Sequence, residues 1–146
     1  MKLLPPVLVG IFVIAMCLLR IVLPGPVIVP QPYNLLGLVL IFVGFAVAFS
    51  GARQFNRAGT NIKTFDDPTL LVTDGLFGWS RNPMYLGLTV FLIGLAIMLE
   101  TLLPFSGAVA FAVITDRWYI KFEEQALRRK FGESYETYAR RTRRWF

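Results

Sequence analysis

The sequence predicts an all-α integral membrane protein, a helical bundle of about four transmembrane helices with a cytoplasmic cap loop and a C-terminal helix. Its 146 residues are 55% hydrophobic and only 16% charged, against about 45–50% and 25% in soluble domains. The apolar residues also gather in long runs. The chain has no His and one Cys. This composition excludes a disulfide framework, thiolate metal sites and imidazole chemistry, and we expect no bound metal.

Two long apolar stretches each provide two of the four predicted spans. Between residues 3 and 52 the only charged residue is Arg20, and between residues 83 and 115 it is Glu100. About 20 apolar helical residues cross a hydrocarbon core of about 30 Å. We therefore expect spans near residues 3–23, 33–50, 84–99 and 102–119. A proline-rich stretch breaks the first pair, and a turn at 99–107, containing Pro104, breaks the second.

The distribution of basic residues predicts the orientation. Arg53, Arg57, Lys63, Arg81 and the basic tail all fall on one side of a four-span bundle, and the positive-inside rule makes that side cytoplasmic. We expect both termini in the cytoplasm and an inner-membrane location in a bacterium or archaeon. A cleaved signal peptide is the alternative for the first segment, but the sequence shows no small-x-small cleavage site after it.

The chain is expected to form one membrane domain over residues 1–146. It comprises two N-terminal spans (1–50), a cytoplasmic cap loop (51–82), two further spans (83–119), and a C-terminal helix with a basic tail (120–146). In the second span Gly37, Gly44 and Gly51 recur every seven residues, and Gly87 and Gly94 do so in the third. Such small residues on one face allow two helices to approach closely.

The segment 51–82 is longer than connections usually are, which indicates a functional or a disordered loop. Apolar residues such as Phe55, Phe65 and Leu76 argue against disorder, and Asp66-Asp67-Pro68 is a turn signal. We expect a folded cap at the membrane surface. An amphipathic segment resting among the lipid headgroups is the alternative.

Polar residues follow the cap and the last span. Asn82 is a good N-cap and Pro83 a favoured first helical residue, so they predict a helix start there. Its free N–H groups, together with Arg81, suit a carboxylate or a phosphate. Glu123 and Glu124 lie in a strongly basic region, where carboxylates suit a cation or an amine.

Taken in order, these motifs resemble one known family of membrane enzymes. They are Leu71-Val72-Thr73-Asp74-Gly75, the run from Arg81 to Gly87, Glu123-Glu124 with Leu127, and Phe131-Gly132 with Tyr135 and Tyr138. They are similar to the isoprenylcysteine carboxyl methyltransferases and related phospholipid methyltransferases. The resemblance covers about residues 59–145.

The resemblance implies an integral membrane methyltransferase that depends on S-adenosylmethionine. The residues that would bind the cofactor lie in the cap, at the start of the third span and on the last helix. They are Leu70, Leu71, Val72, Phe77, Arg81, Asn82, Pro83, Met84, Tyr85 and Glu123. If the acceptor is an ammonium it must first lose a proton, and Glu124 or Tyr119 is our hypothetical catalytic base.

Two positions depart from the family pattern. Asn82 stands where many relatives have His, and Tyr119 where the prenylcysteine branch has an arginine. The implied partner is a membrane lipid or lipid-like acceptor, either isoprenylcysteine carboxylate-like or phospholipid amine-like, with no nucleic acid. The sequence leaves the oligomeric state open. The alternatives are a non-catalytic lipid- or nucleotide-binding membrane protein and an NADPH-dependent membrane reductase.

Overall fold

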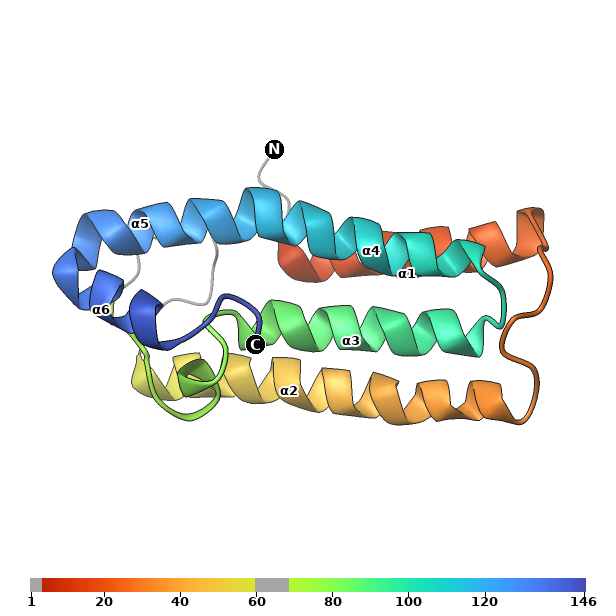
Figure 1. Cartoon of the computed structure of the whole chain (residues 1–146), viewed down its shortest axis with the longest axis horizontal. Helices are drawn as coiled ribbons and strands as arrows, with labels where there is room; N and C mark the ends of the chain where they lie inside the picture. The colour runs from red at the N-terminus through yellow and green to blue at the C-terminus, as the bar shows by residue number, and fades with distance from the viewer. Residues whose placement is uncertain (1–3, 60–68) are drawn as a thin grey trace.

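The computed structural model describes residues 4–59 and 69–146, and its regular elements are helical. Four helices lie lengthwise side by side (Figure 1). They are α1 (Pro5–Val22), α2 (Leu36–Ala58), α3 (Pro83–Met98) and α4 (Leu103–Ile114). Short 3-10 turns, η1 (Tyr33–Leu35) and η2 (Gly75–Gly78), precede α2 and α3. The all-helical prediction is confirmed for the described residues.

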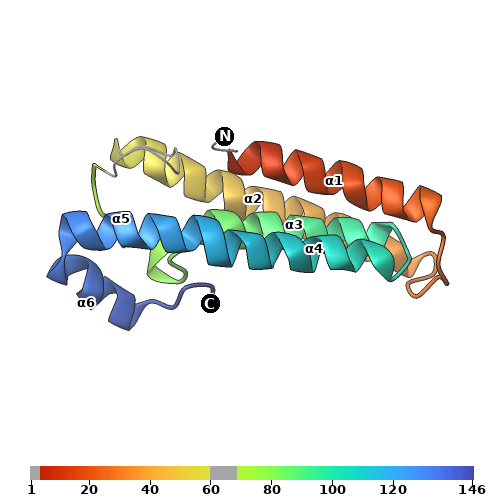
Figure 2. The same cartoon turned by 90° about the horizontal axis from the view of Figure 1, so that it is seen from above.

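The fourth helix does not stop at the end of the apolar run. A π-helical segment, η3 (Thr115–Ile120), joins α4 to α5 (Lys121–Phe131) without a break. Gly132, with φ of +49°, then turns the chain into α6 (Glu133–Arg141). The C-terminal segment, residues 142–146, returns from there toward the start of α3 (Figure 2).

The α2–α3 pair is packed through glycines, as the seven-residue spacing predicted. Gly37, Gly44 and Gly51 are the buried residues of α2. A Cβ added at Gly87 would lie 2.5 Å from the Ala48 nitrogen and 2.6 Å from the Gly44 oxygen. Because these atoms belong to the backbone, the two helices are as close as their main chains allow.

Two of the predicted boundaries are wrong. Helix α2 continues to Ala58, whereas we expected a loop from residue 51. The change to polar residues there indicates that the helix enters a more polar environment and does not mark its end, because residues such as Arg53 and Gln54 are good helix formers. Helix α4 begins at Leu103 with Pro104 in its first turn, where proline is favoured, so the turn is shorter than 99–107. The predicted turn Asp66-Asp67-Pro68 lies outside the described residues.

Within residues 4–59 and 69–146, two helices are long and apolar enough to cross a membrane, α1 and the run Tyr33–Ala58, and α3 is a shorter apolar helix. The single charges of the two apolar stretches meet at the end of the bundle opposite α5. There the Arg20 Nε donates a hydrogen bond to the Leu99 oxygen at 2.9 Å, and its Nη2 lies 3.5 Å from a Glu100 carboxylate oxygen. Each charge thus has a partner.

Glycine substitution tests the α2–α3 contact. A Cβ at Gly94 would lie 2.6 Å from the Gly37 oxygen and 2.7 Å from the Ile41 nitrogen. We expect Gly94→Ala to lower the free energy of unfolding by about 1–3 kcal/mol, the usual cost of overpacking, measured as a lower Tm in detergent. Gly10→Ala is the control because a Cβ there meets nothing within 4 Å, so the higher helix propensity of alanine should leave Tm unchanged or raised. Equal effects of the two substitutions would contradict the close contact.

Candidate functional site

The predicted site residues gather at one end of the bundle. The start of α3, the turn η2, helices α5 and α6, and the C-terminal segment meet there (Figures 1 and 2). Among the described residues, no group of three or more His, Cys, Asp or Glu side chains is placed to hold a metal ion.

Glu124 is the charged centre of this end. It is 4% exposed, yet both carboxylate oxygens accept hydrogen bonds from guanidinium groups. The Arg81 Nη2 donates to Oε1 at 2.9 Å, and Arg144 donates to Oε1 at 3.1 Å and to Oε2 at 2.6 Å. Arg144 also reaches the Asp116 carboxylate at 3.2 and 3.3 Å. Glu124 thereby connects the start of α3 to the C-terminal segment.

The C-terminal segment also occupies the N–H and amide donors just before α3. The Arg81 backbone N–H donates to the Arg143 oxygen at 2.9 Å, and the Asn82 Nδ2 donates to the Arg144 oxygen at 3.1 Å. The Arg81 Nη1 donates to the Ala139 and Thr142 oxygens at 2.8 and 2.9 Å. The sequence predicts Asn82 as the N-cap of α3, and the helix does begin directly after it. Asn82 takes the N-cap position without a side-chain cap bond, because its amide binds the returning chain instead.

Tyr85 and Glu123 join the two motifs that the sequence separates by 38 residues: the Tyr85 hydroxyl donates to the Glu123 Oε1 at 2.8 Å. The Tyr119 ring lies 6.2 Å from that of Tyr85, centroid to centroid. Both tyrosines are buried, with Tyr119 in the π-helical segment. Such segments, which often occur at functional sites, change the direction of the side chains that follow.

The cap is folded onto the same end. The Phe77 ring stacks on Phe55 of α2 with centroids 4.5 Å apart, and the Phe77 oxygen accepts a hydrogen bond from Tyr138 of α6 at 2.6 Å. Gln54 donates to the Asp74 oxygen at 2.8 Å. Leu71 and Val72 are half-buried, and Leu70 is exposed. The predicted cap began at residue 51, but residues 51–58 belong to α2; its remaining described stretch, residues 69–82, is held by α2 and α6.

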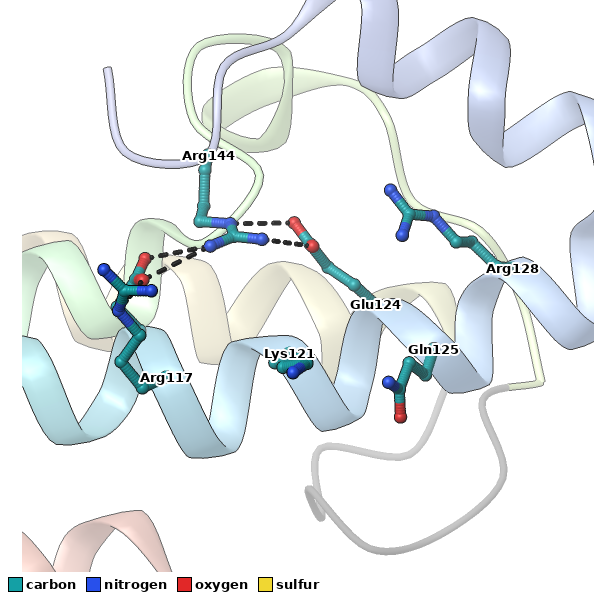
Figure 3. Close-up of a pocket in the computed structure, with 7 residues that line it drawn as sticks. Arg117, Lys121, Glu124, Gln125, Arg128 and Arg144 are labelled. Carbon is teal, nitrogen blue, oxygen red and sulfur yellow. Dashed lines mark hydrogen bonds and ion pairs between the residues drawn. The ribbon is translucent and has the colours of Figure 1, made fainter.

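A hollow of about 420 Å³ opens along α5 (Figure 3). Its acidic lining residues are Asp116 and Glu124. Its other lining residues are Arg117, Lys121, Gln125, Arg128 and Arg144. We call it the α5 hollow. Tyr85 and Glu123 are not among its lining residues, so of the predicted site residues it includes Glu124 alone.

Arg144 and Asp116 were missed by the sequence reasoning. The sequence predicts a basic tail after the C-terminal helix, but residues 133–141 of that tail form the regular helix α6, in which Tyr135 and Tyr138 are buried. The two tyrosines stand three residues apart, which is the spacing of one helical face. The spacing of the two tyrosines could therefore have predicted this helix from the sequence. Nothing in the sequence distinguished Arg144 from several neighbouring arginines.

Burial and ion pairing have opposite effects on the pKa of the Glu124 carboxyl. Burial raises that pKa, but the hydrogen bonds and charges of Arg144 and Arg81 outweigh that effect and lower the pKa below the ordinary value. Glu124 is therefore a carboxylate at neutral pH and a weak proton acceptor.

Acid titration tests this ion-pair network. Since the pKa of Glu124 is lower in the folded chain than the ordinary 4.5, its stabilising contribution is complete above that pH and is lost as the pH falls through the folded value. We expect Glu124→Gln to lower stability at neutral pH by about 3 kcal/mol and to lose less further stability in acid than the native protein. Tm measured against pH checks both. Glu133→Gln, an exposed carboxylate at the start of α6, should keep the native profile, and a native profile for Glu124→Gln would contradict the network.

Comparison with known proteins supports the resemblance drawn from the motifs. Residues 33–134 match the family described as phospholipid methyltransferase. A probable protein-S-isoprenylcysteine O-methyltransferase of Oryza sativa subsp. indica is 31% identical over 110 residues, covering 72% of this chain and 56% of the relative. Protein-S-isoprenylcysteine O-methyltransferase A of Arabidopsis thaliana is 33% identical over 108 residues, covering 70% and 53%.

The protein-S-isoprenylcysteine O-methyltransferase of Homo sapiens is 33% identical over 112 residues, covering 72% of this chain and 38% of the relative. The chain thus spans about half the length of the plant relatives and less of the human one. No solved structure matches it. Because the family match extends over well more than half of the residues, and the Tyr85–Glu123 contact joins two of its motifs, the chain belongs to the phospholipid methyltransferase family.

Proposed function

We propose that the protein is an integral membrane methyltransferase that uses S-adenosylmethionine and acts on a lipophilic or small acceptor. The observation that carries the proposal is the 2.8 Å hydrogen bond from Tyr85 to Glu123. It brings together the start of α3 and the acidic pair of α5, the two regions that family resemblance assigns to the cofactor.

The proposed membrane placement uses four spans: α1, α2, α3, and α4 with η3. Basic residues outside the apolar runs, such as Arg53, Arg57 and Arg128, lie at the α5 end, and Arg20 lies near the opposite end. By the positive-inside rule the α5 end, with the proposed site, faces the cytoplasm. We propose both termini there as well, in a bacterial or archaeal inner membrane.

The side chains at this end suit the parts of the cofactor. S-adenosylmethionine supplies a methyl group on a positively charged sulfonium. The Tyr85 and Tyr119 rings can stabilise that cation, and the Glu123 carboxylate can hold an amine or a ribose hydroxyl. Arg81 keeps a buried Nε–H that has no partner among the described residues, a donor suited to the methionyl carboxylate.

The remaining proposed contacts come from the rest of the cap and from the first turn of α3. Asn82, Pro83 and Met84 begin that helix, and Phe77 is a buried residue of the cap. Leu70, Leu71 and Val72 provide apolar surface near it. We propose that these residues position the donor and exclude water. Positioning of the reactants and exclusion of water are the main ways in which an enzyme lowers the barrier to methyl transfer.

The two proposed catalytic residues differ in their surroundings. Glu124 is held by two guanidinium groups and has a lowered pKa, which makes it a weak base and favours a positioning role. Tyr119 faces Tyr85 and is the better placed of the two. An amine acceptor needs a base, whereas a carboxylate acceptor does not lose a proton before methylation. The names of the relatives favour the isoprenylcysteine carboxylate-like acceptor over the phospholipid amine-like one.

Cofactor binding to the full chain tests the proposed site. We expect S-adenosylmethionine, but not NADPH, to raise the Tm of the purified protein. Tyr85→Phe removes only the hydroxyl that binds Glu123, and Glu123→Gln removes the charge. Because a hydrogen bond to a charged group contributes about 1.5–3 kcal/mol, each should weaken binding by about 10–100-fold.

Tyr33→Phe is the matched control, since Tyr33 is 64% exposed and precedes α2 at the opposite end. It should bind the cofactor as the native protein does. Native affinity in both the Tyr85 and the Glu123 variants would refute the site, and stabilisation by NADPH alone would favour a reductase.

The acceptor can be identified by transfer of labelled methyl groups into a membrane lipid extract. We expect label in an apolar product, and alkaline treatment separates the two proposed classes because a methyl ester is hydrolysed whereas an N-methyl group is not. Tyr85→Phe protein serves as the negative control. Absence of label with every acceptor, from protein that binds the cofactor, would favour the non-catalytic alternative.

A further inference from the structure

The α5 hollow carries positive charge that the described part of the chain does not fully neutralise. Its two carboxylates are engaged: Glu124 by Arg81 and Arg144, and Asp116 by Arg144 and by the Trp145 Nε1 at 2.9 Å. Arg128 pairs with Glu136 at 2.9 Å.

Two further cations line the hollow. Lys121 has no ion pair or hydrogen bond among the described residues. Arg117, whose side chain is 83% exposed, forms a long ion pair of 3.7 Å with the Asp116 Oδ2, an oxygen that Arg144 also binds at 3.3 Å. Gln125 adds amide donors beside them (Figure 3). A hollow with surplus cations and amide donors suits an anion with several acceptor oxygens.

The position of the hollow along the continuous α4–η3–α5 helix indicates its depth in a membrane. From Leu103 to Lys121 the chain advances 18 residues, or about 27 Å at about 1.5 Å per residue, which is close to the thickness of the hydrocarbon core. Trp118 and Phe122 flank Lys121 and are 76% and 37% exposed. Exposed aromatic residues at a span end are typical of the lipid headgroup region. In the proposed four-span placement, the hollow therefore lies at the level of lipid phosphates.

We propose that the α5 hollow binds the phosphate of an anionic phospholipid headgroup, through Lys121 and Arg117 with Gln125. This inference rests on the membrane placement given under the proposed function but does not require methyl transfer. Of the proposed site residues only Glu124 lines the hollow, and both of its carboxylate oxygens are held by Arg81 and Arg144, so we propose that the bound lipid is distinct from the acceptor. It would secure the cytoplasmic end of α5 in the headgroup layer, next to the Arg144–Glu124 contact.

Lipid binding to the full chain, measured without a methyl donor, tests the proposal. Protein in a neutral detergent is titrated with short-chain phosphatidylglycerol or phosphatidylcholine, and native mass spectrometry counts the bound lipid. We expect tighter binding of phosphatidylglycerol. The Arg117→Gln/Lys121→Gln variant should lose at least about tenfold in that affinity, because it removes both cations and their charge-assisted hydrogen bonds to the phosphate.

Arg129→Gln/Lys130→Gln is the matched control. These residues are exposed on the same helix, do not line the hollow, and their substitution removes the same net charge. It should bind phosphatidylglycerol within about twofold of the native protein if the contacts are local rather than long-range. Circular dichroism and Tm confirm that both variants are folded.

The remaining outcomes overturn the proposal. Equal losses in the two variants would show general attraction between a basic surface and an anionic lipid, and equal affinity for the two lipids would show that the hollow does not select an anionic headgroup. Competition by soluble glycerol 3-phosphate at the same concentration as the lipid would assign the hollow to a free phosphate compound. Phosphatidylglycerol binding without methyl transfer would refute the proposed function alone, and methyl transfer without lipid preference would refute this inference alone.

Discussion

The end of the bundle that holds the candidate site depends on one buried carboxylate. Glu124 is almost inaccessible, and removing a charge from water costs several kcal/mol unless partners replace the lost hydration. Arg81 and Arg144 supply those partners. One comes from the residue before the N-cap of α3, and the other from the C-terminal segment, so the charge can be satisfied only when both segments lie against α5. The local fold is therefore coupled to the ionisation of a single side chain.

The close approach of α2 and α3 makes that arrangement feasible. Backbone contact at the glycines holds α3 beside α2, and the stack of Phe77 on Phe55 holds the cap over the end of α2. These contacts place the start of α3 beside the end of α2, where α5 meets it. The π-helical segment then brings Tyr119 beside Tyr85. Helix packing thus places the two tyrosines and Glu123 together, although none of these contacts is local in the sequence.

The C-terminal segment contributes more to the candidate site than the extent of the family match indicates. The family match ends at residue 134, yet Arg144 satisfies Glu124, and the Arg143 and Arg144 oxygens accept hydrogen bonds from Arg81 and Asn82. A segment outside the matched region therefore completes the surroundings of residues inside it. Its Arg144 also lines the α5 hollow, together with Lys121 and Arg117.

The sequence by itself determined the helical class and three of the four span starts to within two residues. It also determined the glycine contact and the motifs that resemble the family. These features follow from hydrophobic runs, small-residue spacing and helix-start signals, which act locally. The sequence placed the end of α2 too early and made the turn before α4 too long, since composition reports surroundings rather than backbone conformation. Only the tertiary structure decided that Asn82 binds the returning chain and that Arg144, among several similar arginines, pairs with Glu124. Ion pairs form between groups that folding brings within a few ångströms, and neither charge pattern nor spacing along the chain encodes that distance.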